Sequence, residues 1–151
     1  MTRPATKDIL FVSGQLLLFI LYVVPLFSFP FHINTVIRYI SLILAIFGVL
    51  IMGLAILQLN KNLTPFPTPK EDGTLIQNGV YKFIRHPIYT GIILIAIGFG
   101  LFHQSLWEIF IGIVLWVLFY FKSSYEEKLL SKHFLNYTAY TKTTGRFFPF
   151  V

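Results

Sequence analysis

The stretch from Tyr39 to Leu59, YISLILAIFGVLIMGLAILQL, decides the fold class of this sequence. It contains no Lys, Arg, Asp or Glu, and a helix of about 20 apolar residues crosses the roughly 30 Å hydrocarbon core of a bilayer. A second stretch of this kind runs from Ile9 to Phe29. We interpret it as a retained signal anchor, because its apolar run is long, no small-residue cleavage site follows, and another span comes soon after. The two stretches predict a membrane protein.

Composition points the same way. The chain of 151 residues is 56% hydrophobic and 12% charged, whereas soluble domains carry about 25% charged residues. The absence of cysteine excludes disulfides, thiolate metal sites and a thiol nucleophile. The net charge of +6 comes from basic residues in short segments between apolar runs. We therefore read these charges as topology signals and contacts to membrane lipid headgroups, and expect no nucleic-acid partner.

Two shorter apolar runs, Ile88 to Phe102 and Leu106 to Phe121, follow a polar stretch. Each is short for a span, but the brief link at His103-Gln104-Ser105 predicts a tight helical hairpin whose helices extend into flanking residues or are shielded by protein. Glu108, near that turn, is expected at the membrane interface. The prediction is an all-α, polytopic integral membrane protein with about four transmembrane helices, forming a single membrane-embedded domain over residues 1–151.

The basic residues predict the orientation. Four spans place the N-terminus, the loop 60–87 and the tail 122–151 on one side of the membrane. That side holds every lysine and arginine but Arg38, namely Arg3, Lys7, Lys61, Lys70, Lys82, Arg85, Lys122, Lys128, Lys132, Lys142 and Arg146. The positive-inside rule puts that side, with both termini, in the cytoplasm.

The loop 60–87 is too apolar for a solvated linker, and we expect it to pack against the cytoplasmic ends of the spans. It ends in Arg85-His86-Pro87-Ile88-Tyr89-Thr90-Gly91. Proline is favoured at the first position of a helix, and the free amides of a helix start attract anions. Gly91 and Gly98 would permit close approach of a neighbouring helix or a ligand. From the residues alone, an interfacial cap and a ligand site are equally good interpretations.

The tail opens with an expected amphipathic helix that continues from the fourth span, because apolar residues recur at helical spacing from Tyr125 to Tyr140. Glu126 and Glu127 have no cation three or four residues downstream, and only Lys122 lies at a helical spacing before them. They are either an ordinary solvated face or the binding site of a cationic ligand. His32, His103 and His133 are scattered and predict no metal site.

The order of these motifs resembles the isoprenylcysteine carboxyl methyltransferase family, part of a wider group that includes phospholipid N-methyltransferases. The resemblance runs from about Leu63 to Pro149 and rests on Gly79-Val80-Tyr81, the Arg85 to Gly91 motif, the hairpin, and Glu126-Glu127. It implies a membrane-embedded methyltransferase that binds S-adenosylmethionine on the cytosolic side. The implied cofactor-binding residues are Gly73, Thr74, Leu75, Ile76, Tyr81, His86, Pro87, Ile88, Tyr89, Glu126 and Glu127.

The sequence departs from the family at one position. The family has an arginine shortly before the acid pair that engages the substrate carboxylate, and here that neighbourhood offers Lys122. Lysine keeps the charge but loses the bidentate fork, so Lys122 or Arg85 is the candidate catalytic cation. The expected acceptor is a prenylated or lipid-like molecule, methylated on a carboxylate. Methylation of a phospholipid amine is the alternative, and a small membrane scaffold or lipid-binding protein is the non-enzymatic one.

Overall fold

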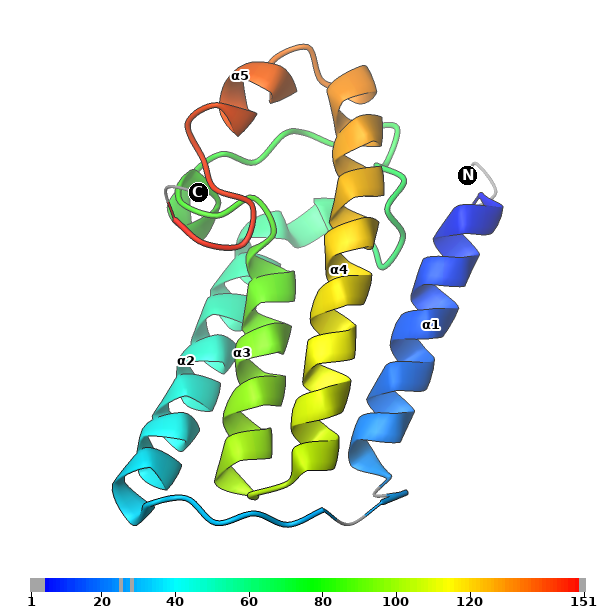
Figure 1. Ribbon diagram of the computed structural model, residues 1–151. Helices are drawn as coiled ribbons and strands as arrows, with labels where there is room; N and C mark the ends of the chain where they lie inside the picture. Colours follow the sequence, from blue (N-terminus) through cyan, green and yellow to red (C-terminus); the bar gives the residue numbers. More distant parts are fainter. Residues whose placement is uncertain (1–4, 25, 28, 150–151) are drawn as a thin grey trace.

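Helices form all the regular structure in the part of the chain that the computed structural model describes, residues 5–24, 26–27 and 29–149 (Figure 1). They are α1 (Thr6–Val23), α2 (Thr35–Leu59), the 3-10 turns η1 (Asn60–Asn62) and η2 (Gly79–Lys82), α3 (Pro87–Phe102), α4 (Leu106–His133) and α5 (Tyr137–Thr141). α1, α2 and α4 are long and apolar enough to cross a membrane, and α3 is a shorter apolar helix. The predicted all-α, polytopic membrane fold is confirmed.

The ends of the helices differ from the predicted spans. α1 stops at Val23 instead of Phe29, because Val24 leaves the helix with extended backbone angles. α2 begins before Tyr39, since the side chain of Asn34 accepts a hydrogen bond from the amide of Val36 and caps the helix. Positions 25 and 28 of the first predicted span, and Arg3 of the charge count, lie outside the described residues.

The predicted hairpin joins α3 and α4. Ser105 caps α4 by accepting from the amide of Glu108, and the Glu108 carboxylate lies 2.9 Å from Nδ1 of His103. α4 then runs without interruption past Phe121, as expected for a tail helix that continues the fourth span. The continuation ends at His133, where Phe134 turns extended and α5 starts as a separate short helix. The helical spacing that reaches Tyr140 is therefore broken in the middle.

Small residues set the contact between α2 and α3. A Cβ atom added to Gly91 would lie 2.7 Å from the carbonyl oxygen of Gly48, and one added to Gly98 would lie 2.7 Å from that of Ser41. Both distances are below van der Waals contact, so only glycine lets the two backbones come this close. The close approach predicted for Gly91 and Gly98 is that of a neighbouring helix.

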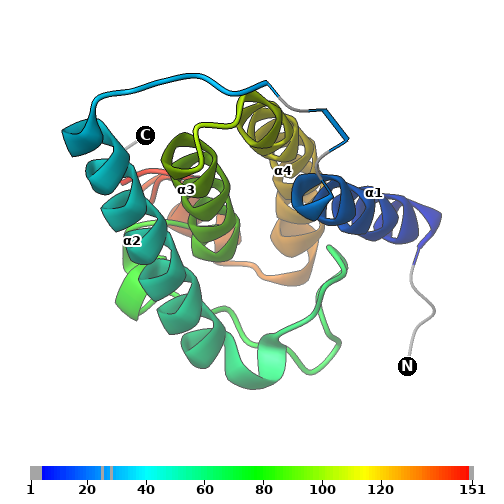
Figure 2. The same cartoon turned by 90° about the horizontal axis from the view of Figure 1, so that it is seen from below.

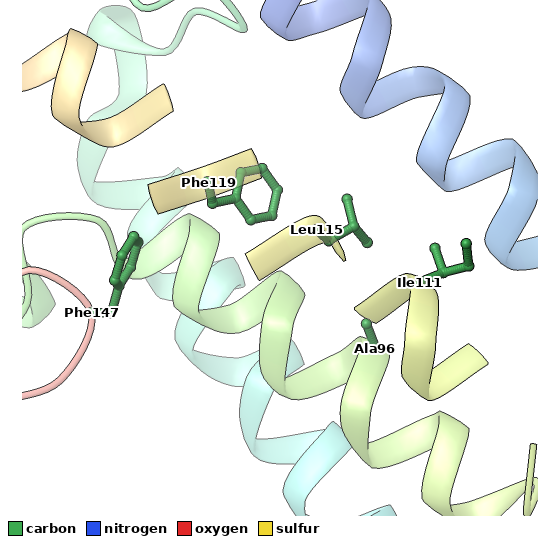
Figure 3. Packing of buried hydrophobic residues seen from close by; sticks show 5 residues of the cluster. All are labelled: Ala96, Ile111, Leu115, Phe119 and Phe147. Carbon is green, nitrogen blue, oxygen red and sulfur yellow. The ribbon is translucent and has the colours of Figure 1, made fainter. Parts of the chain in front are cut away.

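The apolar core lies between α3, α4 and the tail. Ala96 of α3 faces Ile111 and Leu115 of α4, and Phe119 and Phe147 continue the cluster toward the loop end of the bundle (Figure 3). Many large apolar side chains face outward instead, Leu17, Ile43 and Leu57 among them. An outward apolar surface is what a lipid environment requires.

The helices stand in the order α2, α3, α4, α1, so α1 packs on α4 although α2 follows it in the chain (Figure 2). The loop 60–87, α5 and the start of α1 lie at one end of the bundle, and the α3–α4 turn lies at the other (Figure 1). Arg38 is at that opposite end, where its Nε donates to the carbonyl of Phe102. Loop and tail thus share an end, as predicted, while the compartment that this end faces stays a prediction.

Candidate functional site

A cavity of about 370 Å³ opens at the end of the bundle where the loop and the tail meet. This size is within the usual range for small-molecule sites. It is lined by twelve of the thirteen site residues predicted from sequence, Gly73, Thr74, Leu75, Ile76, Tyr81, Arg85, His86, Pro87, Ile88, Tyr89, Lys122 and Glu126. Glu127 is the one that does not line it. The loop, α3 and α4 thus bring together residues that are up to 53 positions apart (73 to 126).

The start of α3 forms one wall, and the chain's tail fixes it in place. Pro87 occupies the first turn of the helix, as predicted. The amides of Arg85 and His86 donate to the carbonyls of Gly145 (2.8 Å) and Arg146 (3.1 Å), so the returning tail runs alongside. The next amides, of Ile88 and Tyr89, have no acceptor within the helix. The wall therefore presents two N–H groups of a helix start for which the described residues supply no acceptor, a favourable place for an anion.

Glu126 faces the cavity and is held there by aromatic residues. Tyr89 Oη donates to Glu126 Oε2 at 2.7 Å. The Tyr89 ring lies between two parallel partners, His86 at a centroid distance of 5.4 Å and Phe119 at 4.6 Å. This stack fixes the tyrosine, and with it the position of the carboxylate. Glu126 is left with acceptor capacity toward the cavity, because a carboxylate accepts several hydrogen bonds.

Glu127 lies on another face of α4, in a network of cations. Its Oε1 is 2.9 Å from Nε of Arg85 and 3.2 Å from Nε2 of His86, and its Oε2 is 2.7 Å from Nη2 of Arg146. No cation lies three or four residues after Glu127 in its own helix. Its cationic partners come instead from the loop (Arg85) and from the tail (Arg146). Protein cations thus account for Glu127 without a cationic ligand, and its predicted contact with a cofactor stays a prediction. Arg146 was missed; its one sequence signal is that it is the only arginine of the tail.

Arg85 lines the cavity but its guanidinium is engaged by protein groups. Besides Glu127, it donates through Nη1 to the carbonyl oxygens of Thr141 and Thr144. These bonds fix the tail against the loop end. Few donors of Arg85 remain for a ligand.

Lys122 lies deep inside, with 2% of the residue exposed. Its Nζ donates to Oε1 of Gln15 at 2.7 Å and to the carbonyl oxygen of Pro65 at 3.1 Å. The ammonium also sits 5.3 Å from the centre of the Tyr89 ring. Gln15 of α1 was missed, because the first span showed no motif; a lone amide within an apolar run was the only signal.

Three buried tyrosines complete the wall on the tail side. Burial raises the pKa of Tyr81 above its ordinary value and that of Tyr140 to about 12, so both hydroxyls stay protonated at neutral pH. Tyr140 donates to the carbonyl of Tyr81. The hydroxyl of Tyr137, also buried, has no hydrogen-bond partner within the described part of the chain. An orphaned donor in a cavity wall is a place where a ligand oxygen would be stabilised.

Comparison with known proteins finds plant relatives that are named as protein-S-isoprenylcysteine O-methyltransferases. A probable protein-S-isoprenylcysteine O-methyltransferase of Oryza sativa subsp. indica is 29% identical over 119 residues, covering 76% of this chain and 62% of the rice protein. Protein-S-isoprenylcysteine O-methyltransferase A of Arabidopsis thaliana is 28% identical over 115 residues, covering 74% of this chain and 58% of the plant protein. The chain thus spans about three fifths of these relatives.

A solved structure shares the fold. The eukaryotic intramembrane Ras methyltransferase ICMT (isoprenylcysteine carboxyl methyltransferase) superposes with a TM-score of 0.70 at 22% identity, over 99% of this chain and 55% of that one. The profile of the phospholipid methyltransferase family matches residues 36–136. This match includes α2, the loop, the hairpin and both glutamates, and it leaves α1 and the end of the tail outside. The chain therefore belongs to the phospholipid methyltransferase family.

Proposed function

We propose that this protein is an S-adenosylmethionine-dependent membrane methyltransferase that methylates the carboxylate of an isoprenylcysteine-like acceptor at the cytoplasmic end of the bundle. The observation that carries the proposal is that the loop residues 73–76, the start of α3, and Glu126 all line one cavity. The names of the plant relatives and the shared fold support the same reaction class.

The residues present fit the proposed cofactor. S-adenosylmethionine carries a carboxylate, an ammonium, a ribose diol and an apolar adenine ring. The free amides of Ile88 and Tyr89 suit its carboxylate, and Glu126 suits its ammonium or ribose hydroxyls. Tyr137 offers the orphaned donor, and apolar side chains of the loop and of α4, such as Leu75 and Leu130, suit the ring.

Glu127 takes a supporting role in this proposal. It bridges Arg85 and Arg146 and touches the His86 ring, so it holds the tail, the loop and the start of α3 together around the cavity. It acts on the cofactor through these residues and is a positioning residue.

The chemistry asks little of the protein beyond positioning and the exclusion of water. When bound, the cofactor supplies an electrophilic methyl group. An acceptor carboxylate is already a nucleophile at neutral pH, so no general base and no covalent nucleophile are required. The protein must orient the carboxylate at about 3 Å from the methyl carbon, which needs a cation beside the site. Lys122 provides a cavity-lining ammonium, whereas Arg85 is occupied by the tail.

The test is a binding and transfer assay on the purified protein in detergent or nanodiscs. Calorimetry should show binding of S-adenosylmethionine to the folded protein, and the labelled methyl group should pass to an S-farnesylcysteine. Absence of cofactor binding by protein that circular dichroism shows to be folded would refute the proposal.

Phosphatidylethanolamine belongs in the same assay, because the matching family is described as phospholipid methyltransferase. Transfer to its amine and none to the farnesylcysteine would replace the proposed acceptor by the phospholipid, with the cofactor site unchanged. Our proposal expects the opposite pattern.

A further inference from the structure

Lys122 is a buried cation that forms no salt bridge among the described residues, and the carboxylates of Glu126 and Asp8 act on it only from beyond 4.0 Å. Its hydrogen-bond partners, Gln15 and the Pro65 carbonyl, are neutral. Among the described residues, the carboxylates within 4.0 Å of a basic nitrogen are Glu108, Glu126 and Glu127, and none of them pairs with Lys122. Burying an unpaired charge is costly. A cavity that keeps such a charge on its wall is prepared for an anionic group from outside.

Gln15 adds a second donor next to this ammonium. The ammonium of Lys122 can only donate, so the amide oxygen of Gln15 is the atom that accepts from it. The NH₂ group of Gln15 therefore remains available as a hydrogen-bond donor. That NH₂ group makes no hydrogen bond to any described residue, and Gln15 lines the cavity together with Lys122. Ammonium and amide are thus neighbouring donors, which matches the two oxygens of a carboxylate.

α1 holds Gln15 through contacts along one stripe of the helix. Asp8, Phe11, Gln15, Leu18 and Tyr22 follow each other at alternating spacings of three and four residues. Asp8 is buried and accepts from Thr68 Oγ1 of the loop at 2.6 Å. Phe11 stacks on Tyr125 of α4, and Tyr22 Oη donates to the carbonyl of Ala96 in α3 at 2.7 Å. The stripe fixes the rotation of α1 that turns Gln15 toward Lys122.

We infer that Gln15 is a specificity-determining residue that, together with Lys122, binds the carboxylate of the methyl acceptor. The inference rests on the proposed function and narrows it: a neutral amide at this position keeps the charge of Lys122 free for an anion and disfavours a cationic amine. α1 lies outside the segment 36–136 that the family profile matches, so the profile by itself does not include this contact.

The experiment measures equilibrium binding of S-farnesylcysteine and of its carboxamide, which lacks the charge, to the purified protein without cofactor. The variants are Gln15→Met, Gln15→Glu and Lys122→Met, with Gln77→Glu, an exposed loop position outside the cavity, as the matched control. The wild type and the control should prefer the carboxylate to the carboxamide. Gln15→Met should reduce this preference about tenfold, the effect of losing one hydrogen bond to a charged group. Gln15→Glu should abolish it.

A purely structural role for Gln15 would weaken both ligands equally, so an unchanged preference in folded Gln15→Met overturns the inference. Gln15→Met is close in size and keeps the helix; should Gln15→Glu not fold, the Met variant decides. The proposed function has a separate test. If the wild-type protein prefers the carboxylate but does not bind S-adenosylmethionine, the inference about Gln15 stands and the proposed methyltransferase activity is refuted. Wild-type protein without any preference for the carboxylate overturns the inference.

Discussion

At the scale of single residues, the two adjacent glutamates have different contacts and therefore different roles. Consecutive positions of an α-helix point about 100° apart, so Glu126 and Glu127 do not face the same place. Glu126 meets Tyr89 and the cavity, while Glu127 meets Arg85 and Arg146. The same substitution at the two positions should therefore have distinct consequences.

Glu127→Gln should destabilise the protein by about 1–3 kcal/mol, because it leaves two guanidiniums without their carboxylate. Glu126→Gln should leave the free energy of unfolding nearly unchanged and weaken the binding of S-adenosylmethionine. Thermal unfolding in detergent and calorimetry measure the two quantities. Glu71→Gln, exposed in the loop, is the control. Equal loss of stability in both variants would contradict the division of roles.

Tyr89→Phe tests the hydroxyl that holds Glu126. The variant keeps the ring between His86 and Phe119 but loses the 2.7 Å hydrogen bond. A hydrogen bond to a carboxylate is worth about 1.5–3 kcal/mol, so the dissociation constant of the cofactor should rise about tenfold or more. Tyr39→Phe, whose side chain is exposed on α2, should bind the cofactor as the wild type does. A Tyr89→Phe protein with wild-type affinity would show that Glu126 needs no such support.

At the scale of the elements, α2 and α3 contain glycines that differ in their surroundings. A Cβ atom at Gly98 would meet backbone of α2 at 2.7 and 2.8 Å, whereas one at Gly53 finds no atom within 4 Å. Both glycines lie inside helices. The contact with the neighbouring helix, and not the helix itself, decides the effect of a substitution.

Gly98→Ala should lower the free energy of unfolding by about 1–3 kcal/mol, because the helices must separate to admit the methyl group. Gly53→Ala should be neutral or stabilising, since alanine favours the helix by up to about 1 kcal/mol. Unfolding in a denaturing detergent titration compares the two. Similar destabilisation by both would mean that the close approach of α2 and α3 does not govern stability.

At the scale of the whole molecule, the site exists only because three segments reach one end of the bundle. The loop supplies residues 73–76 and Tyr81 to the cavity, α1 supplies Gln15, and the tail supplies Arg146, which pairs with Glu127. The loop and the tail must lie on the same side of the membrane, and α1 must reach that side with its first turns. The orientation that the basic residues predict is therefore also a condition for the proposed chemistry.

The cysteine-free sequence allows a direct measurement of this orientation. Single cysteines at Glu71 in the loop and Leu135 in the tail, both exposed, should react with a membrane-impermeant maleimide from the cytoplasmic side. A cysteine at His32, in the exposed connection between α1 and α2, should react only from the other side. Labelling of the loop and the tail from opposite sides would be incompatible with a shared cavity.

The helical membrane fold, the hairpin, and the two segments that line the cavity could be predicted from the amino-acid sequence alone. These features depend on local properties, namely the length of apolar runs, the favoured place of proline in a helix, and the distribution of basic residues. The cofactor-binding role of the loop residues and of Glu126 was predicted from the resemblance to a methyltransferase family and not from local patterns. Helix boundaries were missed by several residues, because capping by Asn34 and the break after His133 outweigh hydrophobic periodicity.

Which side chains become partners depends instead on how the helices, the loop and the tail pack. The spacing around Glu127 offered no cation, yet Arg85 and Arg146 reach it from 42 and 19 positions away. Gln15 meets Lys122 across 107 positions. Such pairs depend on how α1, α4 and the tail rotate and pack against each other, and this rotation is set by contacts between distant segments that no local pattern specifies. The sequence placed the acid pair on a helix; packing decided which acid faces the cavity.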